Sequence, residues 1–169
     1  MNKVYYSFKQ LNSEQLLFEE LSFHAKTQKS VCAWNLLYDK FYAVFNQKLS
    51  GVEFLKSGKP ICKTAYISIS HSDSLVAIAF SKDTETAIDI ELIKQNIPEK
   101  VARFIGKTES VGEFYSGWTE REAVIKAKNY PALKKSAEME FCGITKTVTV
   151  NEKAFSLSIY GENAEFIEI

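Results

Sequence analysis

The sequence predicts an α+β protein of two similar halves, each with helices packed on a three-stranded antiparallel sheet. Residues 26–46 carry apolar side chains at helical spacing, and residues 66–92 alternate apolar and polar side chains in three short runs. A second group of three such runs lies between residues 145 and 169. We place the boundary between the halves at 1–82 and 83–169 and treat them as one compact domain, because 169 residues suit a single domain.

The N-terminal half opens with "KVYYSF" (3–8), an aromatic and β-branched run typical of a strand. Ser13 then suits a helix N-cap, since Leu16, Leu17 and Leu21 follow at helical spacing. The next helix, within 26–46, presents one broad apolar face. Three strands of an antiparallel meander are expected after it: Tyr66–Ser70, Leu75–Phe80 and Thr86–Leu92, joined by "SDS" and "SKDTE".

The C-terminal half has the same order of elements. Residues 98–105 and 117–128 are predicted to be helical, and "TKTVTV", "AFSLSIY" and "AEFIEI" form a second meander around "NEK" and "GEN". No repeat is visible at the level of residues, so the expected duplication rests on element order alone.

Composition argues against several classes of function. Lys plus Arg and Asp plus Glu both number 21, so no basic field favours nucleic acid. No apolar run approaches ~18 residues, which argues against a membrane span. Cys32, Cys62 and Cys142 are widely spaced without a CxxC pair, as expected for reduced thiols. We therefore expect a cytoplasmic protein without nucleic-acid or membrane partners.

Asp89 and Glu91 lie two residues apart on a predicted strand and therefore share one face with Ala87. An amphipathic edge strand with its polar groups in water would give the same pattern. In a meander, however, His71 at the end of the first strand lies near both acids. Two adjacent carboxylates repel each other unless a cation lies between them, and oxygen ligands suit Mg²⁺, which accepts substrate phosphates as further ligands.

Glu122 and Lys126 are spaced i and i+4 and project from the same face of the predicted helix. An ordinary surface ion pair explains this spacing, and so does a capping box formed by Thr119-x-x-Glu122. The functional alternative is a third metal-binding carboxylate beside a phosphate-binding lysine.

Four segments in order, "GKP" (58–60), "ISHS" (69–72), "IDIE" (88–91) and "WTEREAVIK" (118–126), resemble the Sfp-type 4′-phosphopantetheinyl transferases. The similarity covers roughly residues 25–130. It implies the pseudo-duplicated fold of that family, in which the two halves of one chain favour a monomer. It also implies Mg²⁺-dependent transfer of 4′-phosphopantetheine from coenzyme A to a serine of an acyl or peptidyl carrier protein.

The resemblance also implies roles for individual residues. Asp89, Glu91 and Glu122 would hold Mg²⁺, and Glu122 or a metal-associated water would take the proton of the carrier serine. Glu122, Lys126 and His71 would be the catalytic residues. Of these, Lys126 and His71 would contact the pyrophosphate oxygens. The remaining contacts with coenzyme A would come from Ser70, Lys59 and Lys29.

Three positions depart from the family pattern. Ala87 replaces the usual glycine before "IDIE", Arg121 replaces a lysine, and Lys29 replaces an arginine, which keeps the charge but loses the bidentate fork. These departures bear on coenzyme A affinity and carrier choice more than on the metal site.

Two other functions compete with this interpretation. A metal-dependent nuclease with a D…ExK-like cluster fails on spacing, because Lys126 follows Glu122 by four residues rather than two. A non-catalytic module that binds coenzyme A, a nucleotide or a carrier protein on the same scaffold stays open.

Overall fold

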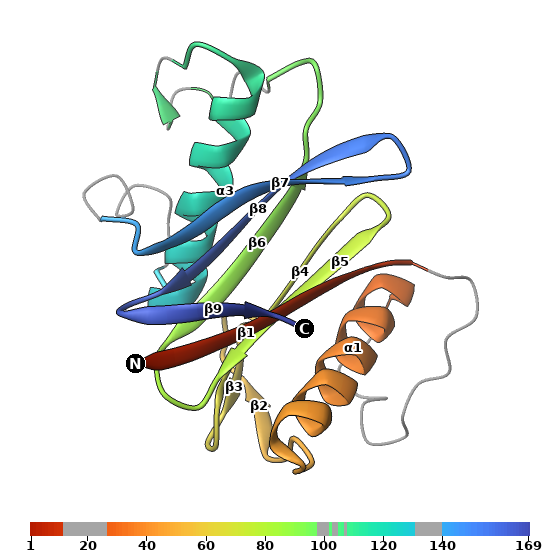
Figure 1. The fold of residues 1–169 in the computed structure, drawn as a ribbon, viewed down its shortest axis with the longest axis vertical. Coiled ribbons are helices and arrows are strands. Elements are labelled where there is room, and N and C mark those ends of the chain that lie inside the picture. The colour runs from red at the N-terminus through yellow and green to blue at the C-terminus, as the bar shows by residue number, and fades with distance from the viewer. Residues whose placement is uncertain (12–26, 98–101, 103–104, 107, 131–139) are drawn as a thin grey trace.

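The computed structural model describes residues 1–11, 27–97, 102, 105–106, 108–130 and 140–169 (Figure 1). Within these ranges the protein is a mixed α+β structure with two helices and three sheets. The helix expected after Ser13 and most of that expected at 98–105 lie outside the described residues. Neither described helix is long and apolar enough to cross a membrane.

One sheet has four strands in the order β4-β5-β1-β9. Its members are β4 (Tyr66–Ser72), β5 (Leu75–Ser81), β1 (Asn2–Gln10) and β9 (Ala164–Glu168). β1 is antiparallel to β5 but parallel to β9, so this sheet joins the first described strand to the last.

The second sheet has three antiparallel strands in the order β6-β8-β7. They are β6 (Thr86–Leu92), β8 (Lys153–Gly161) and β7 (Gly143–Val150). A separate hairpin pairs β2 (Val52–Phe54) with β3 (Pro60–Cys62).

The expected three-stranded sheet is therefore wrong for the N-terminal half, whereas residues 83–169 do contain a three-stranded antiparallel sheet, built from other strands than expected. β6 does not continue the meander, because β4 and β1 already occupy both edges of β5. β6 pairs instead with β8, and β9 leaves the second meander to pair with β1. The strands themselves lie close to the predicted ranges; the errors concern their partners.

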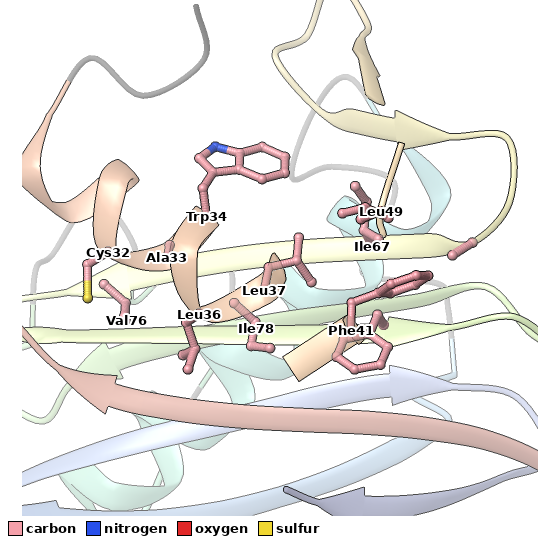
Figure 2. Close-up of a cluster of buried hydrophobic side chains, with 12 residues drawn as sticks. Cys32, Ala33, Trp34, Leu36, Leu37, Phe41, Leu49, Ile67, Val76 and Ile78 are labelled. Atoms are coloured by element: carbon pink, nitrogen blue, oxygen red, sulfur yellow. The ribbon is translucent and has the colours of Figure 1, made fainter. Parts of the chain in front are cut away.

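The burial of β5 explains how the layers stack. All seven of its residues are buried, with Val76, Ile78 and Phe80 facing α1 (Gln28–Phe45). Figure 2 shows Trp34, Leu37 and Phe41 of α1 in this same cluster. The alternate β5 residues pack with Ile88 and Ile90 of β6 between the two sheets.

The outer face of the three-stranded sheet is covered by α3 (Val111–Lys128), as Figure 1 shows. Ala123, Val124 and Ala127 of this helix pack against Ala87 and Tyr160. The layers therefore run α1, four-stranded sheet, three-stranded sheet, α3. Because Ala87 faces α3, Asp89 and Glu91 on the same side of β6 face it as well.

α3 begins six residues earlier than the range predicted from sequence. Its N-cap is Ser110, whose side chain accepts a hydrogen bond from the Glu113 backbone N–H. Thr119 thus lies inside the helix, and the capping box with Glu122 is excluded. The Thr119 hydroxyl is fully buried and bonds Ser156 Oγ at 3.0 Å and Ser158 Oγ at 2.7 Å on β8.

Candidate functional site

The candidate site lies where the edges of the two sheets meet, between β4 and β6. At this seam three backbone N–H groups of β6 donate to serine hydroxyls of β4 rather than to backbone carbonyls. The pairs are Ile88 N to Ser68 Oγ at 3.1 Å, Ile90 N to Ser70 Oγ at 3.4 Å and Leu92 N to Ser72 Oγ at 3.0 Å. The alternation of serine in "SISHS" thus turns every second side chain of β4 toward β6.

Asp89 is buried at this seam, with only 4% of its surface exposed. Its Oδ1 accepts hydrogen bonds from Ser70 Oγ at 2.9 Å and from the Lys126 ammonium at 2.5 Å. The alternative of an edge strand with its acids in water is excluded for Asp89, because α3 covers that face of β6. Its Oδ2 is buried without a hydrogen-bond partner in the described part of the chain.

Glu91 and Glu122 join Asp89 in one electrostatic cluster. Burial raises the pKa of Glu122 above its ordinary value, and the Asp89 and Glu91 carboxylates raise it further, against the opposing effect of Lys126. Burial likewise raises the pKa of Glu91; the hydrogen bond from Ser72, 2.8 Å long, opposes this rise, and Asp89 adds to it. Three carboxylates from β6 and α3 therefore act on each other here.

The position of α3 explains why Glu122 and Lys126 reach this cluster. Thr119 fastens the helix to β8 through its buried hydroxyl. Glu122 and Lys126 follow three and seven residues later, so they lie on the same side of the helix. Lys126 also donates to Ser70 Oγ at 3.0 Å and to the Ile88 carbonyl at 3.3 Å. The plain surface ion pair with Glu122 therefore does not describe Lys126, whose ion pair is with Asp89.

The donor chemistry of this cluster fits a hard divalent cation. Carboxylate oxygens are the ligands that Mg²⁺ prefers, and the partnerless buried Oδ2 of Asp89 is a position that a cation would satisfy. Lys126 and Ser70 hold only the other oxygen, Oδ1. In this structure, however, the described residues contain no group of three His, Cys, Asp or Glu side chains close enough together to hold a metal ion.

A pocket of ≈ 430 Å³ opens beside the cluster, between α1 and α3. β4 forms its floor, and Lys126 and Lys59 both line it. Its volume falls within the range of roughly 300–1,000 Å³ typical of small-molecule sites. Two lysines on a wall that mixes aromatic and aliphatic side chains with serines and an asparagine favour a ligand that carries negative charge.

The turn between β2 and β3 brings Lys59 to the pocket. Gly58 has a φ of +84°, in the left-handed region that a side chain rarely adopts, and its N–H donates to the Leu55 carbonyl at 2.8 Å. The Lys59 ammonium donates to the Ala127 carbonyl at 2.5 Å, near the C-terminus of α3. Burial lowers the pKa of Lys59, and Glu85 partly opposes this effect.

His71 and Lys29 lie on the α1 side of β4, although the charges of Lys126 and Asp89 also act on the pKa of His71. His71 follows Ser70 on β4 and so points to the opposite face from Ser70 and Ser72. The pKa of His71 is lowered, first by desolvation and then by the positive charge of Lys29 in the first turn of α1. Both residues belong to the α1 side of β4, whereas Asp89 and Glu91 belong to the α3 side of β6.

Sequence reasoning missed two groups of residues at this site. Trp34, Phe54 and Tyr130 line the pocket, but the only signal for Trp34 was its place on an apolar helix face. Ser72 contacts Glu91, although the segment "ISHS" gives this residue no role from sequence alone. The period of two in "SISHS" was the signal available for Ser72.

Neither a protein-family model nor a curated protein matches this chain.

Proposed function

We propose that this protein transfers 4′-phosphopantetheine from coenzyme A to a serine of an acyl or peptidyl carrier protein, in a Mg²⁺-dependent reaction. The proposal joins the resemblance of four sequence segments to the Sfp-type transferases with one structural observation. Asp89, Glu91, Glu122 and Lys126 converge at the side of a pocket that a second lysine, Lys59, also lines. Phosphoryl transfer depends on such positioning and charge neutralisation.

In the proposed reaction the carrier serine oxygen attacks the coenzyme A phosphorus that bears the pantetheine arm. A new P–O bond forms, the P–O bond within the pyrophosphate breaks, and adenosine 3′,5′-bisphosphate leaves. The serine proton passes to a base, for which Glu122 is the candidate because burial raises its pKa and so makes it a stronger base than an ordinary carboxylate. Lys126, with its charge beside the pocket, would stabilise the pyrophosphate oxygens.

Asp89, Glu91 and Glu122 would hold the magnesium ion in this proposal, and Asp89 would offer its Oδ2. A bound Mg²⁺ would neutralise the pyrophosphate charge. Lys59 and Lys126 would contact coenzyme A directly, because both line the pocket. Ser70 would act through Asp89 and Lys126, to which its hydroxyl is already bonded. His71 and Lys29 would bind phosphate from the α1 side.

The two-half duplication belongs to the same proposal. It is supported by the order of elements, since α1 and α3 each flank one sheet and the pocket lies between them. β9 would then be a strand of the C-terminal half that crosses to complete the other sheet. Such a two-half chain would act as a cytoplasmic monomer.

The direct test incubates the protein with coenzyme A, Mg²⁺ and purified apo forms of an acyl and a peptidyl carrier protein. Intact-mass spectrometry should show one carrier gaining the mass of one phosphopantetheine group. A carrier with its acceptor serine changed to alanine, and a reaction containing chelator, should show no gain. No mass gain on either carrier, with coenzyme A bound and Mg²⁺ present, would contradict the proposal.

A second candidate is a non-catalytic module that binds coenzyme A or a nucleotide. The ion pair between Lys126 and Asp89 favours it, because this contact already neutralises one of the acids that Mg²⁺ would use. Calorimetry would then show coenzyme A binding that is equally tight with Mg²⁺ and with chelator. The transferase proposal expects Mg²⁺ to strengthen that binding.

A further inference from the structure

The serines of β4 do more than join two strands, because each can contact two groups of β6 at once. Ser72 Oγ accepts a hydrogen bond from Leu92 N–H at 3.0 Å and donates to Glu91 Oε2 at 2.8 Å. Ser70 Oγ repeats this arrangement one rung earlier, with Ile90 N–H at 3.4 Å and Asp89 Oδ1 at 2.9 Å. Each hydroxyl thus bridges a carboxylate and the backbone N–H of the next residue.

Ser68 supplies a third rung that lacks an acid. Its Oγ accepts from Ile88 N–H at 3.1 Å, but the preceding residue on β6 is Ala87. Among the described residues, the Ser68 hydroxyl therefore has no carboxylate to which it donates. Ser68 and Ser72 both accept a hydrogen bond from a backbone N–H of β6, but only Ser72 also donates to a carboxylate. Comparing the two serines therefore separates the joining of the strands from the holding of an acid.

The chemistry of a hydroxyl explains why serine suits this position. A hydroxyl has one proton to donate and two lone pairs, so it can satisfy an edge-strand N–H and a carboxylate together. Once Leu92 N–H occupies one lone pair, the Ser72 proton turns toward Glu91. A short serine side chain, fixed by its strand, then restricts where that carboxylate can lie.

We propose that Ser72 is a positioning residue that holds the Glu91 carboxylate in the site through the same hydroxyl that joins β4 to β6. Its contribution to metal binding rests on the proposed function, whereas the contact with Glu91 does not. Ser70 has the same geometry, but it also bonds Lys126, so Ser72 gives the cleaner test.

The first test needs neither metal nor substrate. It is a double-mutant cycle in which melting temperatures are measured in chelator for Ser72→Ala, Glu91→Ala and the double variant. A control cycle uses Ser68→Ala in place of Ser72→Ala. We expect the Ser72 and Glu91 effects to be non-additive, with the double variant losing less than the sum of the single losses. The Ser68 and Glu91 effects should add. Additive effects in both cycles would overturn the positioning role.

The second test measures the Mg²⁺ concentration that half-saturates transfer, at saturating coenzyme A because Ser68 also lines the pocket. Ser72→Ala should raise it about 10-fold or more, the usual cost of losing a group that orients a metal ligand. Ser72→Thr should restore it, and Ser68→Ala should leave it near the wild-type value. If Ser72→Ala and Ser68→Ala raise the half-saturating Mg²⁺ concentration equally, the serines only join β4 to β6 and Ser72 does not position Glu91. If the wild type transfers nothing, the proposed function fails while the melting cycle still decides the role of Ser72.

Discussion

Asp89 is a buried carboxylate whose two oxygens have different surroundings. Oδ1 has Ser70 and Lys126, and Oδ2 has no hydrogen-bond partner among the described residues. Asp89→Asn keeps the shape of the side chain but removes the charge that pairs with Lys126. It also removes one of the three acids on which the proposed metal site depends.

We expect Asp89→Asn to abolish Mg²⁺-dependent transfer while the protein still folds. The stability loss should be modest, about 1 kcal/mol, because 31% of the Lys126 side chain is exposed and water can solvate the freed ammonium. Urea denaturation beside the carrier-mass assay measures both effects. Transfer at the wild-type rate in low Mg²⁺ would show that Asp89 is not a metal ligand.

Glu122 should make the metal-free protein less stable as the pH rises. Its folded-state pKa is raised from the ordinary value of 4.5, so the folded protein favours the protonated form. The resulting stabilisation is fully present below pH 4.5 and is lost as the pH rises through the raised folded-state pKa. Glu122→Gln, which stays neutral, should therefore be more stable than wild type at pH 7 and similar to it below pH 4.5.

Melting temperatures in chelator across this pH range test the expectation, with Glu120→Gln as a control on the same helix. The same Glu122→Gln protein should lose transfer by about 10²-fold or more, because its amide cannot take a proton. Greater stability together with full activity would mean that Glu122 is buried for packing alone.

At the scale of elements, the attachment of α3 to β8 determines where its functional side chains lie. Thr119 Oγ1 bonds two serines of β8 and also the Tyr115 carbonyl at 3.0 Å. Thr119→Val fills the same space but leaves these buried groups short of a partner. We expect it to lower the free energy of unfolding by about 1–3 kcal/mol.

The matched control is Thr147→Val, on an exposed position of β7, which should change stability by less than about 0.5 kcal/mol. Urea denaturation compares the two variants. If Thr119→Val unfolds at the wild-type urea concentration, the hydroxyl contacts do not fasten the helix, and another contact must position Glu122 and Lys126.

Local pattern was enough to find most elements but not their partners. Period-two alternation located β4, β5 and β6, and helical spacing located α1, because these signals depend only on neighbouring residues. The choice of β8 as partner for β6 depends on residues 60 or more positions away, which no local pattern records. Likewise the acids at 89 and 91 were found together, but the burial of Asp89 followed from the packing of α3 over β6.

At the scale of the whole molecule, the two predicted halves depend on each other. β9 completes the sheet that holds β1, and the N–H groups of β6 need the serines of β4. A core of residues from both sheets, including Val4, Ala79 and Ile88, would also be exposed by separation. The boundary at residue 82 is therefore expected to mark no unit of independent folding.

We expect fragments 1–82 and 83–169 to lack a cooperative thermal transition when each is expressed alone. Mixing them should restore one, because the seam and the shared core can form again. Far-ultraviolet circular dichroism of each fragment and of the mixture measures this. A cooperative transition in either fragment alone would contradict the dependence of the halves on each other.

The parallel pairing of β1 with β9 also has a consequence for biosynthesis. Register partners such as Asn2 and Ala164 are separated by nearly the whole length of the sequence, which is a very large separation for a single strand pairing. A ribosome makes β1 first, so its second edge must wait for β9 while the intervening segments emerge. During that interval the nascent chain presents an unpaired strand edge, a surface on which wrong strands can pair and to which chaperones can bind.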